Sequence, residues 1–241
     1  MKKVLVAFFA MAAIVVFARH NWEKIKGSGN LKSETRSVGE FKGIYSQGSM
    51  DVVITYGSSN SIEVEADDNI LPYIETSLND NSLVVKTKDN SNIQTKNKIV
   101  VRVQMTKIQN ISLSGSGNIK GDGAFTNEGK TKLSVSGSGN INLGFNVFEK
   151  TQTSIAGSGN IILKHGGSKR LEANVAGSGN VDASAITFEE VDADIRGSGN
   201  VKVKVDKSLE AHISGSGNVY YSGNASNVNS RASGSGKLVK V

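Results

Sequence analysis

Apolar and polar residues alternate along the second half of the chain, and the alternation keeps one phase relative to a repeated tetrapeptide, Gly-Ser-Gly-Asn. An aliphatic residue stands two positions before the first glycine and another stands four positions after it. The two columns are Leu113, Val135, Ile155, Val175, Ile195, Ile213 and Ala232 before the motif, and Ile119, Ile141, Ile161, Val181, Val201, Val219 and Leu238 after it. A period of two is typical of a half-buried β-strand, so strands are predicted on both sides of every copy.

The tetrapeptide recurs at a nearly constant spacing. From Gly115 onward the first glycines are separated by 22, 20, 20, 20, 18 and 19 residues, counting the near-copy Gly234–Lys237. Such a period indicates a solenoid, whose coils bury their apolar faces only by stacking on one another. The leucine-dense consensus of leucine-rich repeats is absent. We therefore predict an all-β fold: a single-domain parallel β-helix or β-solenoid, right-handed, with a corner about every 20 residues.

The two aliphatic columns are six residues apart, so the alternation passes through the tetrapeptide without a change of phase. The glycines are then predicted on the inward face of a sharp corner, where only a residue without Cβ fits, and Ser and Asn on the outward face. A conventional turn with Asn in the left-handed region is the alternative. The predicted corner glycines are Gly115, Gly117, Gly137, Gly139, Gly157, Gly159, Gly177, Gly179, Gly197, Gly199, Gly215 and Gly217.

The segment before the regular copies also favours strands. Runs such as "MDVVITYG" and "KIVVRVQM" are rich in β-branched residues, and turn-forming "GSSN" and "NDN" separate them. We expect residues 31–241 to form one domain, with 31–110 as irregular N-terminal coils or a cap and 111–241 as regular coils. Residues 19–30, which include an isolated Gly27–Asn30 copy, are predicted to be a tether.

The N-terminus has the pattern of a secretory signal peptide. Lys2 and Lys3 precede an apolar run, Val4–Ala18, with small residues ahead of a cut before Arg19. An uncleaved anchor is the alternative, although a membrane span needs roughly 20 residues. The chain has no cysteine, so neither a disulfide framework nor a lipid-modified cysteine is available. We expect export to the periplasm, the outer membrane surface or the medium, with no transmembrane segment in the mature chain.

Charge adds little to this picture. Removing Lys2 and Lys3 lowers the formal net charge from +6 to +4, and the remaining basic residues are mixed with acidic ones. No basic helix and no stripe of basic and aromatic residues is present, so nucleic acid is not an expected partner.

One binding hypothesis follows from the phase of the repeat. If Ser and Asn point outward, they form two rows with a spacing of about 4.8 Å per coil. The predicted strip comprises Ser138, Asn140, Ser158, Asn160, Ser178, Asn180, Ser198 and Asn200. Rows of hydroxyls and amides suit a repeating polymer such as a glycan. The structural alternative is that stacked Asn and Ser satisfy one another and the corner backbone.

Candidate catalytic and metal sites are weak. Glu172, Asp192 and Glu210 should form a vertical row beside Asp194 and His212, and carboxyl groups about 5 Å apart can hydrolyse glycosides. The short connections predict no cleft around that row, so we expect no enzyme activity and no catalytic residue. The glycines lack the strand-to-helix context of a phosphate loop, and an Asn every twenty residues is too weak a ligand set for calcium. The histidines His20, His165 and His212 are scattered, so we expect no metal and no cofactor.

The serial motif, with "SVGEFKGIYSQGSMDVVITYG" and "LNDNSLVVKT" before it, resembles the head GIN domain family, described as putative auto-transporter adhesins of Bacteroidetes. The resemblance covers about residue 38 to the end. It implies a β-helix-like fold, export and adhesion, and it supplies no catalytic residues. The expected function is that of an exported, non-enzymatic adhesin or surface binding protein, with a glycan or an envelope component as partner and homo-oligomers through open solenoid ends. The alternatives are a structural or envelope-stress-associated protein without a ligand and, less favoured, a polysaccharide lyase or hydrolase.

Overall fold

The computed structural model describes residues 24–241. The predicted signal peptide, residues 1–18, and the first part of the predicted tether lie outside the described residues. Within the described residues, no helix is long and apolar enough to cross a membrane.

The described chain consists of strands and one short 3-10 helix, η1 (Leu71–Tyr73). The N-terminal strands are β1 (Lys24–Lys26), β2 (Leu31–Arg36), β3 (Gly43–Gly48), β4 (Asp51–Tyr56), β5 (Ser61–Asp67), β6 (Ile74–Asn79), β7 (Ser82–Thr87), β8 (Asn92–Gln94) and β9 (Val100–Met105). The remaining strands are β10 (Asn110–Gly115), β11 (Asn118–Asp122), β12 (Thr126–Gly137), β13 (Asn140–Gly157), β14 (Asn160–Gly177), β15 (Asn180–Gly197), β16 (Asn200–Gly215), β17 (Val219–Ser222), β18 (Asn227–Gly234) and β19 (Leu238–Lys240).

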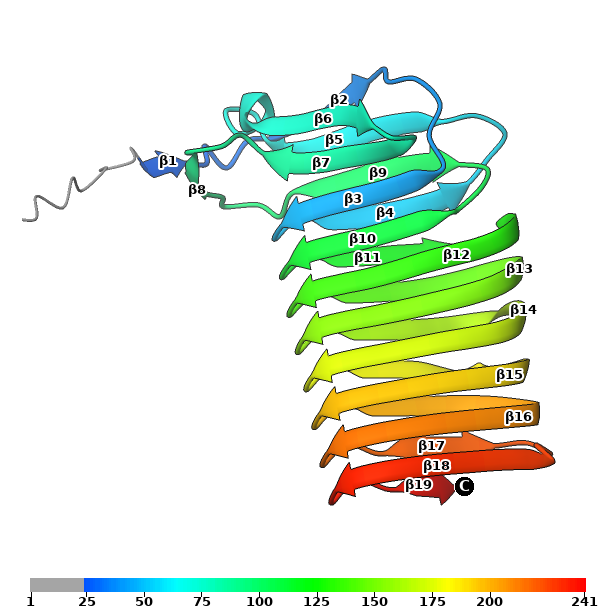
Figure 1. Ribbon diagram of the computed structural model, residues 1–241. Coiled ribbons are helices and arrows are strands. Elements are labelled where there is room, and N and C mark those ends of the chain that lie inside the picture. The colour runs from blue at the N-terminus through cyan, green and yellow to red at the C-terminus, as the bar shows by residue number, and fades with distance from the viewer. Residues whose placement is uncertain (1–23) are drawn as a thin grey trace, which may run out of the picture.

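Strands β10–β19 stack in parallel as a β-solenoid, which confirms the predicted fold class (Figure 1). Each of the strands β13–β15 is one whole coil. It starts at the Asn of one motif, follows one face, bends at the far edge and returns along the other face to the first glycine of the next motif. We call the side that enters the motif the leading face and the side that leaves it the trailing face. The motifs lie along one edge, where the arrowheads in Figure 1 line up.

The interior is built from the two predicted aliphatic columns. From Leu113 to Ile213 and from Ile119 to Val219, the side chains of both columns are buried. At the far edge, the buried rings of Phe145 and Phe148 stack with their centroids 3.9 Å apart. The columns end differently at the last coil, where Ala232 is exposed and Leu238 is partly buried, because no further described strand covers them.

Strands β3 and β4 form a coil with a degenerate motif that the sequence analysis missed. Gly48 pairs in register with Gly115, and Asp51 pairs with Asn118. The tetrapeptide Gly48–Asp51 therefore occupies the place of Gly-Ser-Gly-Asn one coil earlier. The aliphatic residue four positions after its first glycine, Val52, is buried like its counterparts and was the available signal. The polar Ser46 at the preceding inward position hid the repeat.

Antiparallel strands close the N-terminal end. On the leading face, β6 and β7 form a hairpin whose β7 pairs with β3. On the trailing face, β2 and β5 continue from β9, which pairs with β4. The β3–β4 coil thus lies between the later strands β7 and β9 and the regular coils, so the order along the chain differs from the order in the stack.

The isolated Gly27–Asn30 copy packs against this cap with a conformation of its own. Its second glycine, Gly29, has a φ of +90°, whereas in the regular copies the first glycine has the positive φ. The Ser28 amide donates to Asn69 Oδ1, and the Ser28 hydroxyl donates to Asp68. Beside it the buried Asp67 accepts from the Lys96 amide at 2.9 Å. Residues 24–30 of the predicted tether are therefore attached to the cap by β1–β8 pairing and these hydrogen bonds.

The corner explains why two glycines recur. From the degenerate corner to Gly197, the carbonyl of each first glycine accepts hydrogen bonds from two amides of the next coil; Gly115 accepts from Ser138 at 3.0 Å and from Gly139 at 2.9 Å. A Cβ on either glycine would collide with a carbonyl oxygen of the coil before it, as Gly117 would with Met50. The first glycine also has a φ between +119° and +133° in the regular copies, a region that L side chains rarely adopt.

At the degenerate corner, which has no corner before it, glycine is still needed at the first position of the motif but not at the second. Between β7 and β9, residues 88–99 include the short strand β8 and form no corner against Gly48, and no atom lies within 4 Å of a Cβ built on Gly48. Gly48 keeps a φ of +112°, and glycine is retained there. The second glycine is replaced by Met50, whose side chain is buried. Contact with a preceding corner is thus the constraint on the second position.

We predict that Gly179→Ala lowers the free energy of unfolding by about 3 kcal/mol, because backbone atoms of the preceding coil must move to admit the methyl group. Gly167→Ala is the matched control: its Cβ would meet nothing closer than Asn146 O at 3.6 Å, so its effect should stay within about 0.5 kcal/mol. Urea unfolding measures both variants. Equal stability of the two variants would contradict the corner constraint.

Candidate binding surface

The asparagines of the motif form a hydrogen-bonded ladder along the corner edge. Each amide nitrogen donates to the side-chain oxygen of the previous coil, at 3.0 Å for Asn140, 2.8 Å for Asn160 and 2.9 Å for Asn180 and Asn200. The oxygen also accepts a backbone amide from the next coil at several steps, as Asn180 Oδ1 does from Asn200 N at 3.1 Å. These side chains are partly buried. The ladder therefore satisfies both the amides and part of the corner backbone.

The ladder begins and ends with other residues. Asp51 of the degenerate corner accepts from the Asn118 side chain at 2.8 Å and from its backbone amide at 3.1 Å. At the other end, Asn218 Oδ1 accepts the Lys237 amide at 3.1 Å. None of these asparagines has a positive φ, since the described non-glycine residues with positive φ are Asp80, Asn81 and Asn90. The alternative geometry, with a left-handed Asn in the turn, is therefore wrong.

The serines of the motif lie outside the ladder. Ser138, Ser158, Ser178 and Ser198 are exposed. Over residues 24–241 their hydroxyls have no hydrogen-bond partner in the protein, in contrast to the asparagines beside them. One row of the predicted strip is thus engaged internally, and the other row presents free hydroxyls to solvent, one per coil.

The predicted carboxylate row is present on the leading face. Glu172, Asp192 and Glu210 are paired in register, and so are Asn174, Asp194 and His212 in the neighbouring column. These six residues line an open depression of about 440 Å³, which we call the acidic groove. Within the described chain, no three His, Cys, Asp or Glu side chains are arranged to hold a metal ion.

The charges of the acidic groove are not equivalent. Glu172 is bound by Lys150 at 2.6 Å and Lys130 at 3.2 Å, and the hydrogen bond from Lys150 is the main cause that holds its pKa below the ordinary value. Asp192 has a raised pKa, first because burial penalises its charge and second because Glu210 lies beside it. The pKa of Asp192 is thus raised and that of Glu172 is lowered, although the two residues are paired in register on adjacent coils.

A second depression lies on the trailing face, beside the asparagine ladder. It has a volume of about 760 Å³, and we call it the trailing hollow. Its lining combines the ladder amides of Asn160, Asn180 and Asn200 with residues of varied chemistry from successive coils, which are Ile162, Val181, Asp182, Ser184, Lys202, Val203, Tyr220, Ser222 and Val241. The sequence analysis missed it, because the outward residues of this face share no chemical type from coil to coil.

The histidines do not converge. His165 Nε2 lies 2.8 Å from Asp122 at the far edge, and His212 Nε2 lies 3.6 Å from Glu210 in the acidic groove. His20 lies outside the described residues.

The model of the family described as "Putative auto-transporter adhesin, head GIN domain" matches residues 40–225. The chain belongs to the head GIN domain family. This confirms the resemblance noted in the sequence, and the family's description as adhesins indicates a surface or exported protein. Comparison with curated protein sequences found no match.

Solved structures share the fold of this chain over nearly their whole length. A putative adhesin from Bacteroides fragilis has a TM-score of 0.82 at 20% identity, with 90% of this chain and 100% of that chain covered. A putative lipid binding protein from Parabacteroides distasonis has a TM-score of 0.75 at 22% identity, with coverage of 91% and 100%. A putative adhesin from Parabacteroides merdae has a TM-score of 0.69 at 25% identity, with coverage of 90% and 99%.

For the ladder of this head GIN domain, we predict that Asn180→Ala costs about 1–3 kcal/mol of unfolding free energy, because it leaves the Asn200 amide without its acceptor. Ser178→Ala, two residues away, is the control and should change stability by less than about 0.5 kcal/mol. Denaturant unfolding measures both. If Ser178→Ala were as damaging as Asn180→Ala, the division between ladder and free hydroxyls would be wrong.

Substitutions of Asp192 and Glu172 in the acidic groove should change the melting temperature in opposite directions. At pH 7, Asp192→Asn should raise Tm, since a carboxyl with a raised folded-state pKa destabilises the fold when it is ionised. Glu172→Gln should lower Tm by about 2–4 °C, since it removes about 1 kcal/mol of ion pairing.

As the pH falls, the two differences from the wild type should disappear. Asp192 takes up its proton at a higher pH in the folded protein than in the unfolded chain, so its destabilising effect vanishes below the ordinary Asp pKa. The stability that Glu172 contributes is lost as the pH falls through its lowered folded-state pKa. Thermal melts of both variants between pH 7 and pH 3 measure this. Shifts of the same sign at pH 7 would refute the assignment.

Proposed function

We propose that this head GIN protein is an exported, non-enzymatic adhesin that binds a repeating glycan along its corner edge. The observation that carries the proposal is the row of exposed motif serines, whose hydroxyls have no partner within residues 24–241 and recur once per coil, about 4.8 Å apart. A rigid row of equivalent hydroxyls suits a polymer, because every sugar unit meets a copy of the same donor and acceptor. The family's adhesin description supports the same class of function.

The asparagines of the predicted strip have a different part in this proposal. Their oxygens are occupied by the next coil, while each Nδ2 carries two hydrogens and donates one to the ladder. The ladder therefore fixes the spacing of the edge and keeps one N–H per coil for a ligand. This arrangement supports a structural role for the asparagine oxygens, which bond within the ladder, and a glycan-binding role for the serine hydroxyls.

Hydrolysis or lysis at the acidic groove is less well supported. Glu172 is neutralised by two lysines, which leaves it unsuited to donate a proton, and the groove lies open on a flat face. A pair of carboxyl groups needs a bound, oriented substrate to act as acid and base. We infer that the groove contributes to surface charge and not to catalysis.

The test is a glycan array with the secreted protein, followed by affinity measurements on each hit. The triple variant Ser158→Ala, Ser178→Ala, Ser198→Ala should bind at least about tenfold more weakly, since each lost hydrogen bond contributes about 0.5–1.5 kcal/mol. Its Tm should match that of the wild type. The matched control replaces Ser33, Ser58 and Ser77, three exposed serines of the N-terminal part, and should bind like the wild type.

A blank array would overturn the proposal and favour the second candidate, a structural envelope protein without a ligand. That candidate is favoured by the edge strands β18 and β19, beyond which no described strand lies; unpaired edges promote association between copies. Binding that survives the triple serine variant unchanged would place the ligand elsewhere on the surface.

A further inference from the structure

We propose that the trailing hollow is a subsite for an acidic sugar, with the carboxylate of the sugar held by Lys202 and its ring packed against Tyr220. This inference rests on the proposed function, and it names the class of glycan and the place where one unit is recognised. The hollow adjoins the ladder, so a chain lying along the corner edge can place one unit in it.

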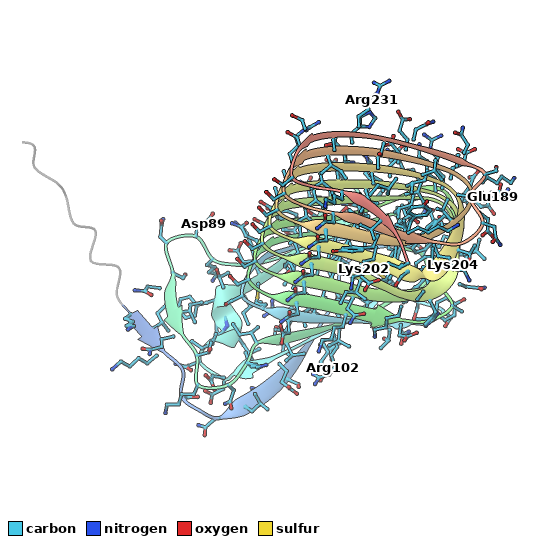
Figure 2. All side chains as sticks on the ribbon, turned by 90° about the horizontal axis from the view of Figure 1, so that it is seen from below. Asp89, Arg102, Glu189, Lys202, Lys204 and Arg231 are labelled. Carbon is cyan, nitrogen blue, oxygen red and sulfur yellow. The ribbon has the colours of Figure 1, made fainter. Side chains whose placement is uncertain are left out.

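Free lysines on the trailing face favour an anionic ligand on this side. Lys164 of β14 and Lys202 and Lys204 of β16 lie exposed on the trailing face, and in residues 24–241 none of them has an ion-pair partner. In Figure 2, Lys202 and Lys204 project on the opposite side of the solenoid from Arg231, which belongs to the leading face. On the leading face, Glu172 is already paired with Lys130 and Lys150. The free ammonium groups of the trailing-face lysines therefore favour an anionic ligand on the trailing face.

Lys202 is available although an acid lies opposite it. Asp182 pairs in register with Lys202, yet its Oδ1 accepts from the backbone amide and the hydroxyl of Ser184 at 3.1 and 2.6 Å. No ion pair joins Asp182 to Lys202 in the described chain. The ammonium group of Lys202 thus remains free in the lining of the trailing hollow. A charged hydrogen bond from it to a carboxylate is stronger than a neutral one.

The rest of the lining fits a sugar ring. Tyr220 is paired in register with Lys202 on the next coil, both side chains line the trailing hollow, and Ile162 in the same lining is exposed. Sugar rings have apolar C–H faces and polar edges, which match an aromatic side chain next to amides and hydroxyls. Asn160, Asn180 and Asn200 each present the N–H that the ladder leaves unused.

The experiment measures binding of three probes to the full protein by isothermal titration calorimetry. The probes are an oligogalacturonate, a neutral cello-oligosaccharide of equal length, and laurate as a carboxylate with an apolar tail. We expect the oligogalacturonate to bind at least about tenfold more tightly than the neutral probe at low salt, and to lose that advantage at 1 M NaCl.

Two variants locate the site. Lys202→Gln and Tyr220→Leu should each weaken oligogalacturonate binding by about tenfold, whereas Lys120→Gln, an exposed lysine of the same face far from the hollow, should leave it unchanged. Ser222→Asp, which adds a repelling charge to the lining, should also weaken it. Melting curves confirm that each variant is folded.

The outcomes separate this inference from the proposed function. Equal binding of acidic and neutral probes, or oligogalacturonate binding unaffected by Lys202→Gln, overturns the subsite while the serine row stands. Binding of laurate without the oligogalacturonate overturns it in favour of a lipid carboxylate. Failure of every glycan, on the array and in solution, overturns both.

Discussion

The structure depends on backbone pairing that continues around a corner. In an ordinary sheet, hydrogen bonds between strands end where the chain turns, but here the carbonyl of the first glycine still accepts two amides of the next coil at every corner up to Gly197. Such close stacking leaves no room for a Cβ on the inner side of the bend. Once the corners are stacked, the aliphatic columns on both sides fall into register and are buried, and the irregularities between coils are confined to the far edge.

One tetrapeptide therefore serves three separate purposes. The glycines permit the approach of neighbouring backbones, the asparagine ties each corner to the next through its side chain, and the serine stays free. Because the asparagine has an amide with two hydrogens and one oxygen, it stabilises the edge and keeps a donor available. Because of this division, the corner geometry can repeat from coil to coil while the serine row stays open to a ligand.

Much of the fold was predictable because it is local. The period of two around each motif identifies the strands, and the constant spacing identifies the stacking of Leu113 on Val135 and of Ile119 on Ile141. Residues 31–110 escaped such reasoning, since their pairings join distant segments, such as β3 with β10 and β2 with β5. The degenerate corner was hidden by Ser46 and Met50, which break the pattern where no preceding corner enforces it.

The candidate sites divide in the same way. The carboxylate row could be predicted, because side chains one period apart must be neighbours in a parallel stack, and the register confirms it. The state of those side chains could not, since the pKa of Asp192 and that of Glu172 depend on burial and on lysines from other coils. The trailing hollow has no repeated chemistry, so only the folded coils bring Ile162, Lys202 and Tyr220 together.

The degenerate corner at Gly48–Asp51 gives the solenoid a fixed beginning. Every later corner is shaped by the one before it, whereas this corner carries a methionine and an aspartate that suit the place under the cap. Whole coils of about twenty residues can therefore be duplicated or lost after it, and each such event changes the length of the molecule by about 4.8 Å while both the cap and the corner chemistry stay the same. The length of the solenoid can therefore vary with the number of coils, while the N-terminal cap and its first corner stay unchanged.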